Sequence, residues 1–244
     1  MQEVVLKEIP FTEKVGDNPT ESAPNITEDS LFIHNGELIG FYINKVSDKV
    51  FNLLNIANKE LLSDRVPKSI MRRASGVEQY STIIGSIPPS RLRKHTLQSS
   101  VHRDKKARKF VRAMLALNIE AEKIIKKYAP EIYHRQVKII ANAIPDQFRI
   151  GKMFTSSINN ANISADYHQD NANLKNTVNC IFYKKRKARG GDLSVPKYGA
   201  TIASTDGSML VYPAWRDMHG VTPIEADQDG YRNSFVFYPL RRTI

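Results

Sequence analysis

The feature that most constrains the fold is a series of short apolar segments in the second half of the chain. Glycine, proline, asparagine and aspartate separate these segments. Short strands at close spacing are typical of a sandwich or a barrel. We expect the strands over residues 137–141, 153–163, 177–183, 200–203, 208–212 and 233–238.

The first half of the chain is predicted to add a hairpin and two helices. Apolar runs flank Asn35-Gly36, the pair preferred in two-residue hairpin turns. Apolar residues recur at helical spacing after Ser47, and a second helical stripe runs from about Lys105 to Tyr128. Polar residues between the N-terminus and the hairpin predict a loop over 11–30.

These patterns predict two regions along the chain. Residues 1–90 are expected to form an N-terminal extension, whose hairpin and helix pack on the core. Residues 91–244 are expected to form the core with its supporting helix.

The composition indicates which kind of partner and which cellular compartment to expect. The chain has 36 basic and 25 acidic residues, and the net charge of +11 favours a polyanion such as DNA, the alternative being simple solubility. The single cysteine, Cys180, excludes an internal disulfide and suits a reducing compartment. Since neither a secretory signal nor a long apolar run occurs, we expect no membrane partner, and no obligate protein partner is evident. We expect a cytoplasmic protein (bacterial or viral-host cytosol), or a nuclear one in a eukaryote.

Two histidines and one aspartate predict a metal site. His168 and Asp170 are two residues apart, so on an extended chain their side chains point the same way. A sheet that folds back on itself can bring His219 beside them. Two imidazoles and one carboxylate are the ligands of non-haem Fe(II) oxygenases. A second His-x-Asp triplet, His102 to Asp104, has no histidine and arginine downstream at close spacing. We expect Asp104 to lie in the first turn of the long helix, where a carboxylate faces the helix dipole.

Arg232 and Ser234 predict the second half of this site. They share one face of an expected strand, shortly after His219. Arginine is a forked, permanently charged donor that suits a carboxylate. The order of residues therefore predicts Fe(II) and 2-oxoglutarate, with O2 as the oxidant.

Several short motifs resemble a known group of oxygenases. The matching segments are residues 154–156, 168–173, 190–193 and 219–223. They resemble 2-oxoglutarate oxygenases that include the ten-eleven translocation (TET) methylcytosine dioxygenases and the base-J-type (JBP) thymine hydroxylases. The resemblance covers about residues 91–237. It implies an α+β protein, a double-stranded β-helix (distorted jelly roll) braced by N-terminal helices.

The resemblance also implies roles for individual residues. His168, Asp170 and His219 match the iron ligands, and Arg232 and Ser234 match the 2-oxoglutarate site. Asn160 and Asn162 are expected near the cosubstrate or the base. Asn173 matches an asparagine that contacts the target base, although a turn residue bonding its own backbone is the alternative.

Two basic segments are candidates for DNA contacts. Arg91 to Lys109 carries eight basic residues against Asp104 alone. The second segment is expected to be a loop between two strands, either solvated or holding phosphates, which gives affinity without reading sequence. Its candidate contacts are Lys184, Lys185, Arg186 and Lys187.

The function implied is hydroxylation of the 5-methyl group of a pyrimidine in DNA. The matches at Asn173 and residues 177–180 favour 5-methylcytosine over thymine. Two alternatives stay open: a 2-oxoglutarate oxygenase acting on a protein side chain or a small molecule, and a non-catalytic DNA-binding jelly roll. The cysteine-rich zinc module of the animal enzymes is absent, since the chain has one cysteine.

Overall fold

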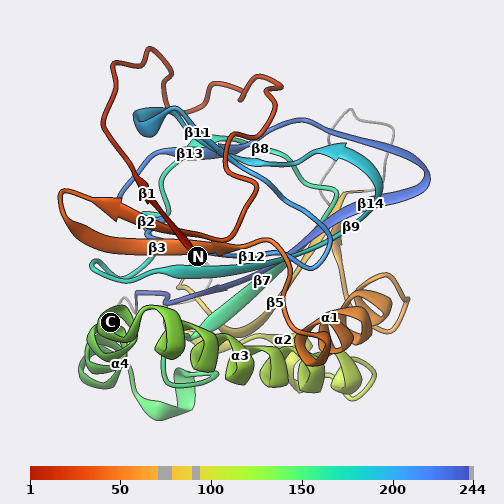
Figure 1. Ribbon diagram of the computed structural model, residues 1–244. Helices are drawn as coiled ribbons and strands as arrows, with labels where there is room; N and C mark the ends of the chain where they lie inside the picture. The colour runs from red at the N-terminus through yellow and green to blue at the C-terminus, as the bar shows by residue number, and fades with distance from the viewer. Residues whose placement is uncertain (71–78, 90–93, 242–244) are drawn as a thin grey trace.

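Two facing sheets and a layer of helices make up the computed structural model (Figure 1), which describes residues 1–70, 79–89 and 94–241. The described strands of the larger sheet are β1 (Gln2–Val5), β2 (Ser30–His34), β3 (Glu37–Ile43), β4 (Ser69–Ile70), β5 (Tyr80–Ile87), β6 (Leu97–Gln98), β7 (Ser156–Ala161), β9 (Asn179–Gly190), β12 (Met209–Tyr212) and β14 (Ile224–Tyr238). Those of the smaller sheet are β8 (Ala165–His168), β10 (Leu193–Val195), β11 (Ala200–Ile202) and β13 (His219–Val221).

The strand order places β9 and β14 near the middle of the larger sheet. That order is β1-β2-β3-β12-β9-β14-β7-β5-β4, with β6 paired to β5, and the smaller sheet runs β11-β10-β13-β8. The helices lie on the other side of the larger sheet from the smaller one (Figure 1). They are α1 (Asp48–Leu61), α2 (Ser100–Arg103), α3 (Arg108–Tyr128) and α4 (Pro130–Ala143), with short 3-10 turns η1 (Asp146–Phe148) and η2 (Pro196–Tyr198).

Alternation along the central strands explains why both faces of the larger sheet are covered. In β9, Cys180 and Phe182 join the apolar cluster formed with the helices, whereas Ile181 and Tyr183 join the cluster between the two sheets. Successive side chains of a strand point to opposite faces, so one strand supplies both layers. The double-stranded β-helix braced by helices is thereby confirmed.

The predicted hairpin and the first two long helices are confirmed. Asn35 and Gly36 have φ angles of 51° and 78°, the left-handed values that a tight hairpin turn between β2 and β3 requires. Helix α1 starts after Ser47, and α3 ends at Tyr128 as expected. Both helices bury their apolar stripes against the larger sheet.

The strand predicted over residues 137–141 is wrong, because this segment lies inside α4. The buried positions of α4 are Ile132, Gln136 and Ile140, which recur at helical spacing. The central one is polar: Gln136 donates to the carbonyls of Met153 and Val178 and accepts from the Val178 N–H. Since the apolar stripe is interrupted, the β-branched residues alone suggested a strand.

Two other local predictions are also wrong. The basic segment from Lys184 to Arg189 is not a loop, because it continues β9 and pairs with β14. Asp104 is not in the first turn of α3, because α2 ends at Arg103 and α3 begins only at Arg108; its carboxylate accepts from the Lys106 N–H instead.

The N-terminal strands share the larger sheet with the C-terminal ones. Strand β3 pairs with β12, and β5 pairs with β7. The boundary expected at residue 90 lies outside the described residues, as do Arg91 and Arg93 of the first basic segment. None of the helices in the described part of the chain is long and apolar enough to cross a membrane.

Candidate metal and cosubstrate site

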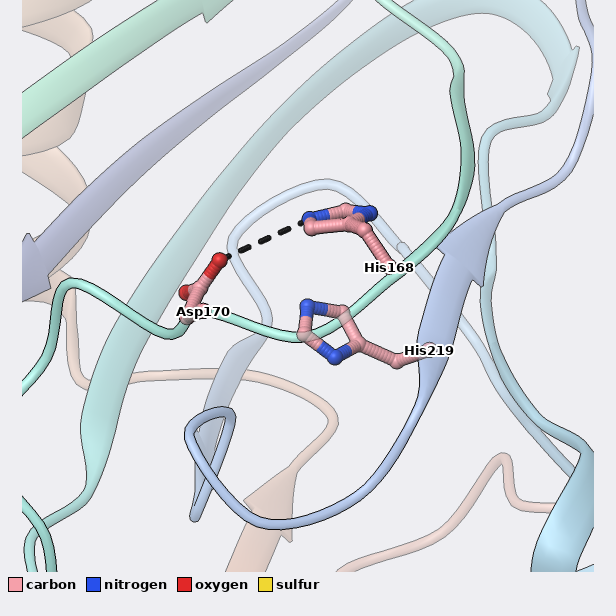
Figure 2. Close-up of side chains that lie close together, drawn as sticks. All are labelled: His168, Asp170 and His219. Carbon is pink, nitrogen blue, oxygen red and sulfur yellow. Dashed lines mark ion pairs between the residues drawn. The ribbon is translucent and has the colours of Figure 1, made fainter. Parts of the chain in front are cut away.

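The three expected metal ligands lie together at one end of the smaller sheet. His168 ends β8, His219 begins β13, and these two residues are direct partners in the antiparallel pairing of the strands. One ligand atom from each histidine and from Asp170 fall within 4.8 Å of one another. Figure 2 shows the three side chains converging, and its dashed line marks the ion pair between His168 and Asp170. The Nε2 and Oδ1 atoms of this pair are 3.5 Å apart.

Both imidazoles are oriented by backbone carbonyls. His168 Nδ1 donates to the Asp166 carbonyl at 2.7 Å, and His219 Nδ1 donates to the Asp217 carbonyl at 3.0 Å. A carbonyl only accepts, so Nδ1 carries the proton, and Nε2 keeps its lone pair whenever the ring is neutral; the Asp170 carboxylate beside His168 Nε2 favours a second proton there when no metal is bound. That is the tautomer a metal ion needs, and such partners fix the ring orientation.

Two amides orient the carboxylate of Asp170. Its Oδ2 accepts from Asn179 Nδ2 at 2.8 Å and from Asn173 Nδ2 at 3.3 Å, while Oδ1 faces His168. Burial acts to raise the pKa of Asp170, but the hydrogen bond from His168 and the nearby imidazoles outweigh it, so the pKa is lowered. The carboxylate is therefore held ionised, with one oxygen available to a cation.

The two histidines titrate in opposite directions. The hydrogen bond to Asp170 raises the pKa of His168, with burial opposing it. Burial lowers the pKa of His219, which is only 5% exposed. Once His168 has lost its second proton, two neutral imidazoles and one carboxylate converge here, which is the ligand set of a facial triad for Fe(II).

A cavity of about 230 Å³ extends from these side chains between the two sheets. Arg232, Ser234 and Asn160 line it, and the register pairs Ser234 with Asn160 across β14 and β7. Arg232 is 2% exposed; it donates to the Gly191 carbonyl and lies 4.7 Å from the centre of the Tyr183 ring. Burial lowers the pKa of Arg232. Arg232 forms no ion pair with a carboxylate of the described residues, and a buried cation without one is costly, so this end of the cavity suits a carboxylate.

Two of the expected contact residues hold other residues of the site in place. Asn162, with φ of 55°, does not line the cavity; its Oδ1 accepts from the Arg232 N–H. Asn173 is 6% exposed and donates to Asp170 and Asn179, so it supports the carboxylate. The sequence reasoning missed Asn179, although it lies within residues 177–180 that carried part of the resemblance.

The second basic segment has a mixed environment. Lys184 is buried and forms an ion pair with Asp206 at 2.7 Å, with its ammonium 4.0 Å from the centre of the Phe51 ring. Arg186 donates to the Asp229 carbonyl. Lys187 is exposed, with φ of 44°. The segment is therefore no uniform row of solvated cations.

A second, more open cavity of about 480 Å³ adjoins the first. It shares Asp170, Ile158 and Val236 with the first cavity, which is lined by Arg232 and is called the cosubstrate cavity below. Ile83, Tyr238 and Leu240 add apolar surface, and Gln169, Asn171 and Asn173 add amides. A substrate in this space would lie directly beside the candidate metal ligands.

Residues 89–241 match the family model Tet_JBP, described as the oxygenase domain of the 2OGFeDO superfamily. The chain belongs to this family. It is thus a TET/JBP-type oxidoreductase that uses Fe(II), 2-oxoglutarate and O2, as the residue order predicted.

The chain is also similar to solved structures. NgTET1 in complex with 5mC DNA aligns with a TM-score of 0.58 at 12% identity, covering 93% of this chain and 82% of that chain. An oxidoreductase of the 2OG-Fe(II) oxygenase family from Burkholderia pseudomallei gives 0.45 at 13%, covering 82% and 84%. OsALKBH1 gives 0.46 at 13%, covering 82% and 96%. The likeness to NgTET1 shows a common fold. No curated protein sequence matches the chain.

Proposed function

We propose that this TET/JBP-type oxygenase hydroxylates the 5-methyl group of a pyrimidine in DNA, with 5-methylcytosine preferred over thymine. The observation that carries the proposal is the pair of adjoining cavities that meet at Asp170. One is closed by a buried arginine and suits a dicarboxylate; the other is open and suits a flat ring. A base in a duplex must be flipped out to reach such a site.

In this proposal His168, Asp170 and His219 hold the iron. Arg232 and Ser234 bind the far carboxylate of 2-oxoglutarate, and Arg232 offers the charge that no described carboxylate neutralises by an ion pair. When bound, iron and 2-oxoglutarate supply the oxidising power that converts a methyl group to hydroxymethyl, with O2 consumed and succinate and CO2 released.

The lining of the open cavity fits a methylated base. Ile158 and Val236 lie on β7 and β14 and border both cavities, so apolar surface surrounds the place where the methyl group would meet the metal. Apolar walls exclude water and protect a reactive centre. Gln169 and Asn171 are exposed at the rim, and amides can pair with base edges.

The charge of the protein supports a nucleic-acid substrate. The net charge is +11, and DNA neutralises clustered cations through its phosphates. Lys184 is buried and paired with Asp206, so the exposed cations of β9 are Arg186, Lys187 and Arg189, the last of these 3.2 Å from Glu225. We assign phosphate contact to these three and not to Lys184.

Mass spectrometry of nucleosides tests the proposal. DNA containing thymine and 5-methylcytosine is incubated with Fe(II), 2-oxoglutarate and the protein, with His168→Ala as the control. We expect 5-hydroxymethylcytosine from the unmutated chain alone. If 5-hydroxymethyluracil is the main product, the base preference is wrong. If neither base changes while 2-oxoglutarate is consumed, the DNA proposal is wrong and a protein side chain or small molecule becomes the substrate to seek.

We also propose that the protein works in a reducing compartment that holds DNA, either the cytosol of a bacterium or infected host, or a nucleus. The single cysteine supports this, because a chain with one cysteine forms no internal disulfide, as is usual in reducing compartments. Fractionation of the source cells, with detection of the native protein, tests the assignment; recovery from an oxidising compartment would contradict it.

A further inference from the structure

Lys185 faces the same space between the sheets as the cosubstrate arginine. In the pairing of β9 with β14, Lys185 lies opposite Arg232 and Tyr183 lies opposite Ser234. Residues directly opposite in an antiparallel pair project to the same face. Tyr183, Arg232 and Ser234 all line the cosubstrate cavity, so Lys185 projects into the layer behind it.

The ammonium of Lys185 is directed to a glycine turn and not to solvent. Its Nζ donates to the Gly190 carbonyl at 2.7 Å, and its side chain is 18% exposed. The next carbonyl along the chain, that of Gly191, accepts from Arg232 Nη2. Two cations on neighbouring strands thus bind two successive carbonyls of one turn.

The glycine turn packs tightly against the arginine. Gly190 and Gly191 have φ angles of 65° and 73°, which other residues rarely adopt. A Cβ atom on Gly191 would lie 2.8 Å from Arg232 Nε, and one on Gly190 would lie 1.9 Å from the Pro223 carbonyl oxygen. The position of this turn therefore determines where the guanidinium group can lie.

One buried carboxylate accompanies the two cations. Asp192 is 5% exposed, and its Oδ1 accepts from the N–H and the hydroxyl of Ser204 at 2.7 and 2.8 Å. The same oxygen is 4.0 Å from Lys185 Nζ. Lys185, Arg232 and Asp192 carry a formal charge of plus one together, which a single ligand carboxylate would balance.

The titration of Lys185 agrees with this charge balance. Burial lowers the pKa of Lys185; Asp192 opposes this effect and Arg232 adds to it. The charged form of a lysine with too little negative charge around it is stabilised when an anion binds nearby.

We infer that Lys185 is a positioning residue for the 2-oxoglutarate site, which fixes the Gly190–Gly191 turn against Arg232, and that it is not a phosphate contact. The inference rests on the proposed role of Arg232. It changes the assignment of a residue that the sequence placed on the DNA-binding surface.

Binding of 2-oxoglutarate, measured by calorimetry on the Fe(II)-loaded protein without O2 or DNA, tests the inference. Lys185→Met removes both the charge and the hydrogen bond to the turn, and we expect it to weaken binding about tenfold or more. Lys185→Arg retains a cationic donor and is expected to recover most of the affinity. If Lys185 only filled space in the fold, Lys185→Arg would not restore the affinity for 2-oxoglutarate.

Matched variants separate the two possible roles. Lys187→Met, on the same strand but exposed, is expected to leave the 2-oxoglutarate affinity unchanged and to weaken DNA binding at low salt. Lys185→Met is expected to leave the salt dependence of DNA binding unchanged. Thermal unfolding of each variant reports whether it is folded, and if Lys185→Met is not, Lys185→Gln replaces it.

Three outcomes would contradict the inference or its basis. If Lys185→Met binds 2-oxoglutarate as well as the unmutated chain, Lys185 does not position the site. If it instead reduces the salt dependence of DNA binding, Lys185 is a phosphate contact. Arg232→Met separates the proposed cosubstrate site from the role of Lys185. Unchanged 2-oxoglutarate binding by Arg232→Met would refute the cosubstrate site itself. Weakened binding by Arg232→Met together with unchanged binding by Lys185→Met would refute only the inference about Lys185.

Discussion

Gly191→Ala should weaken 2-oxoglutarate binding by displacing Arg232. The built Cβ atom lies 2.8 Å from Arg232 Nε and 3.0 Å from its Cδ and Cγ atoms. Arg232 is 2% exposed, so the side chain has little room to move away. The left-handed backbone costs an alanine about 1–2 kcal/mol, and overpacking adds about 1–3 kcal/mol. Displacing Arg232 also removes its hydrogen bond to the carboxylate of 2-oxoglutarate. Loss of such a charged hydrogen bond corresponds to roughly a ten- to hundred-fold loss of 2-oxoglutarate affinity.

Gly36→Ala is the matched control. Gly36 has φ of 78°, close to the 73° of Gly191, but a Cβ atom there meets nothing within 4 Å. This variant should lose only the backbone contribution of about 1–2 kcal/mol. Urea unfolding of the metal-free proteins and anaerobic calorimetry with 2-oxoglutarate measure both effects. The reasoning is refuted if the two variants lose equal stability and both keep full 2-oxoglutarate affinity.

Three further predictions concern the metal ligands and the sheet. Asn179→Ala removes the donor to Asp170 and should lower Fe(II) affinity about 10–100-fold in a metal titration; an unchanged affinity would show that the carboxylate needs no such support. The raised pKa of His168, due first to its hydrogen bond with Asp170, stabilises the metal-free fold below about pH 6.5, and this contribution is lost as the pH rises through the raised pKa. Fe(II) affinity should rise over the same window because the metal needs the neutral ring, and His168→Gln should abolish both trends. Gly40→Ala should destabilise the protein by about 3 kcal/mol in urea, because its Cβ would lie 2.2 Å from the Val211 carbonyl oxygen; a loss of under about 1 kcal/mol would mean that β3 and β12 can separate.

Short-range patterns made much of the fold predictable. The turn at Asn35-Gly36 needs two left-handed residues in succession, and few pairs other than these adopt them readily. The stripes of α1 and α3 recur at helical spacing because one helix face is buried. At Gln136 a buried position of α4 is polar, so the helical pattern of apolar residues is interrupted and the helix was missed. Gln136 can be buried because it hydrogen-bonds to Met153 and Val178, which are distant in the sequence.

The sequence by itself determined the ligand types. His168, Asp170, His219 and Arg232 predicted Fe(II) and 2-oxoglutarate because few side chains supply neutral nitrogens, a carboxylate and a forked cation in that order. His168 ends β8 and Asp170 lies two residues further on, and this spacing became informative because His219 and Arg232 follow it.

Only the tertiary structure decided which polar residues support those ligands and which face solvent. Strand pairing sets His219 against His168 and Lys185 against Arg232, across separations of 51 and 47 residues that no local pattern records (219 − 168 and 232 − 185). It also directs Asn173 to Asp170. Long-range register depends on how all strands of a sheet pair and pack together, so a residue's charge could be read from the chain but its partner could not.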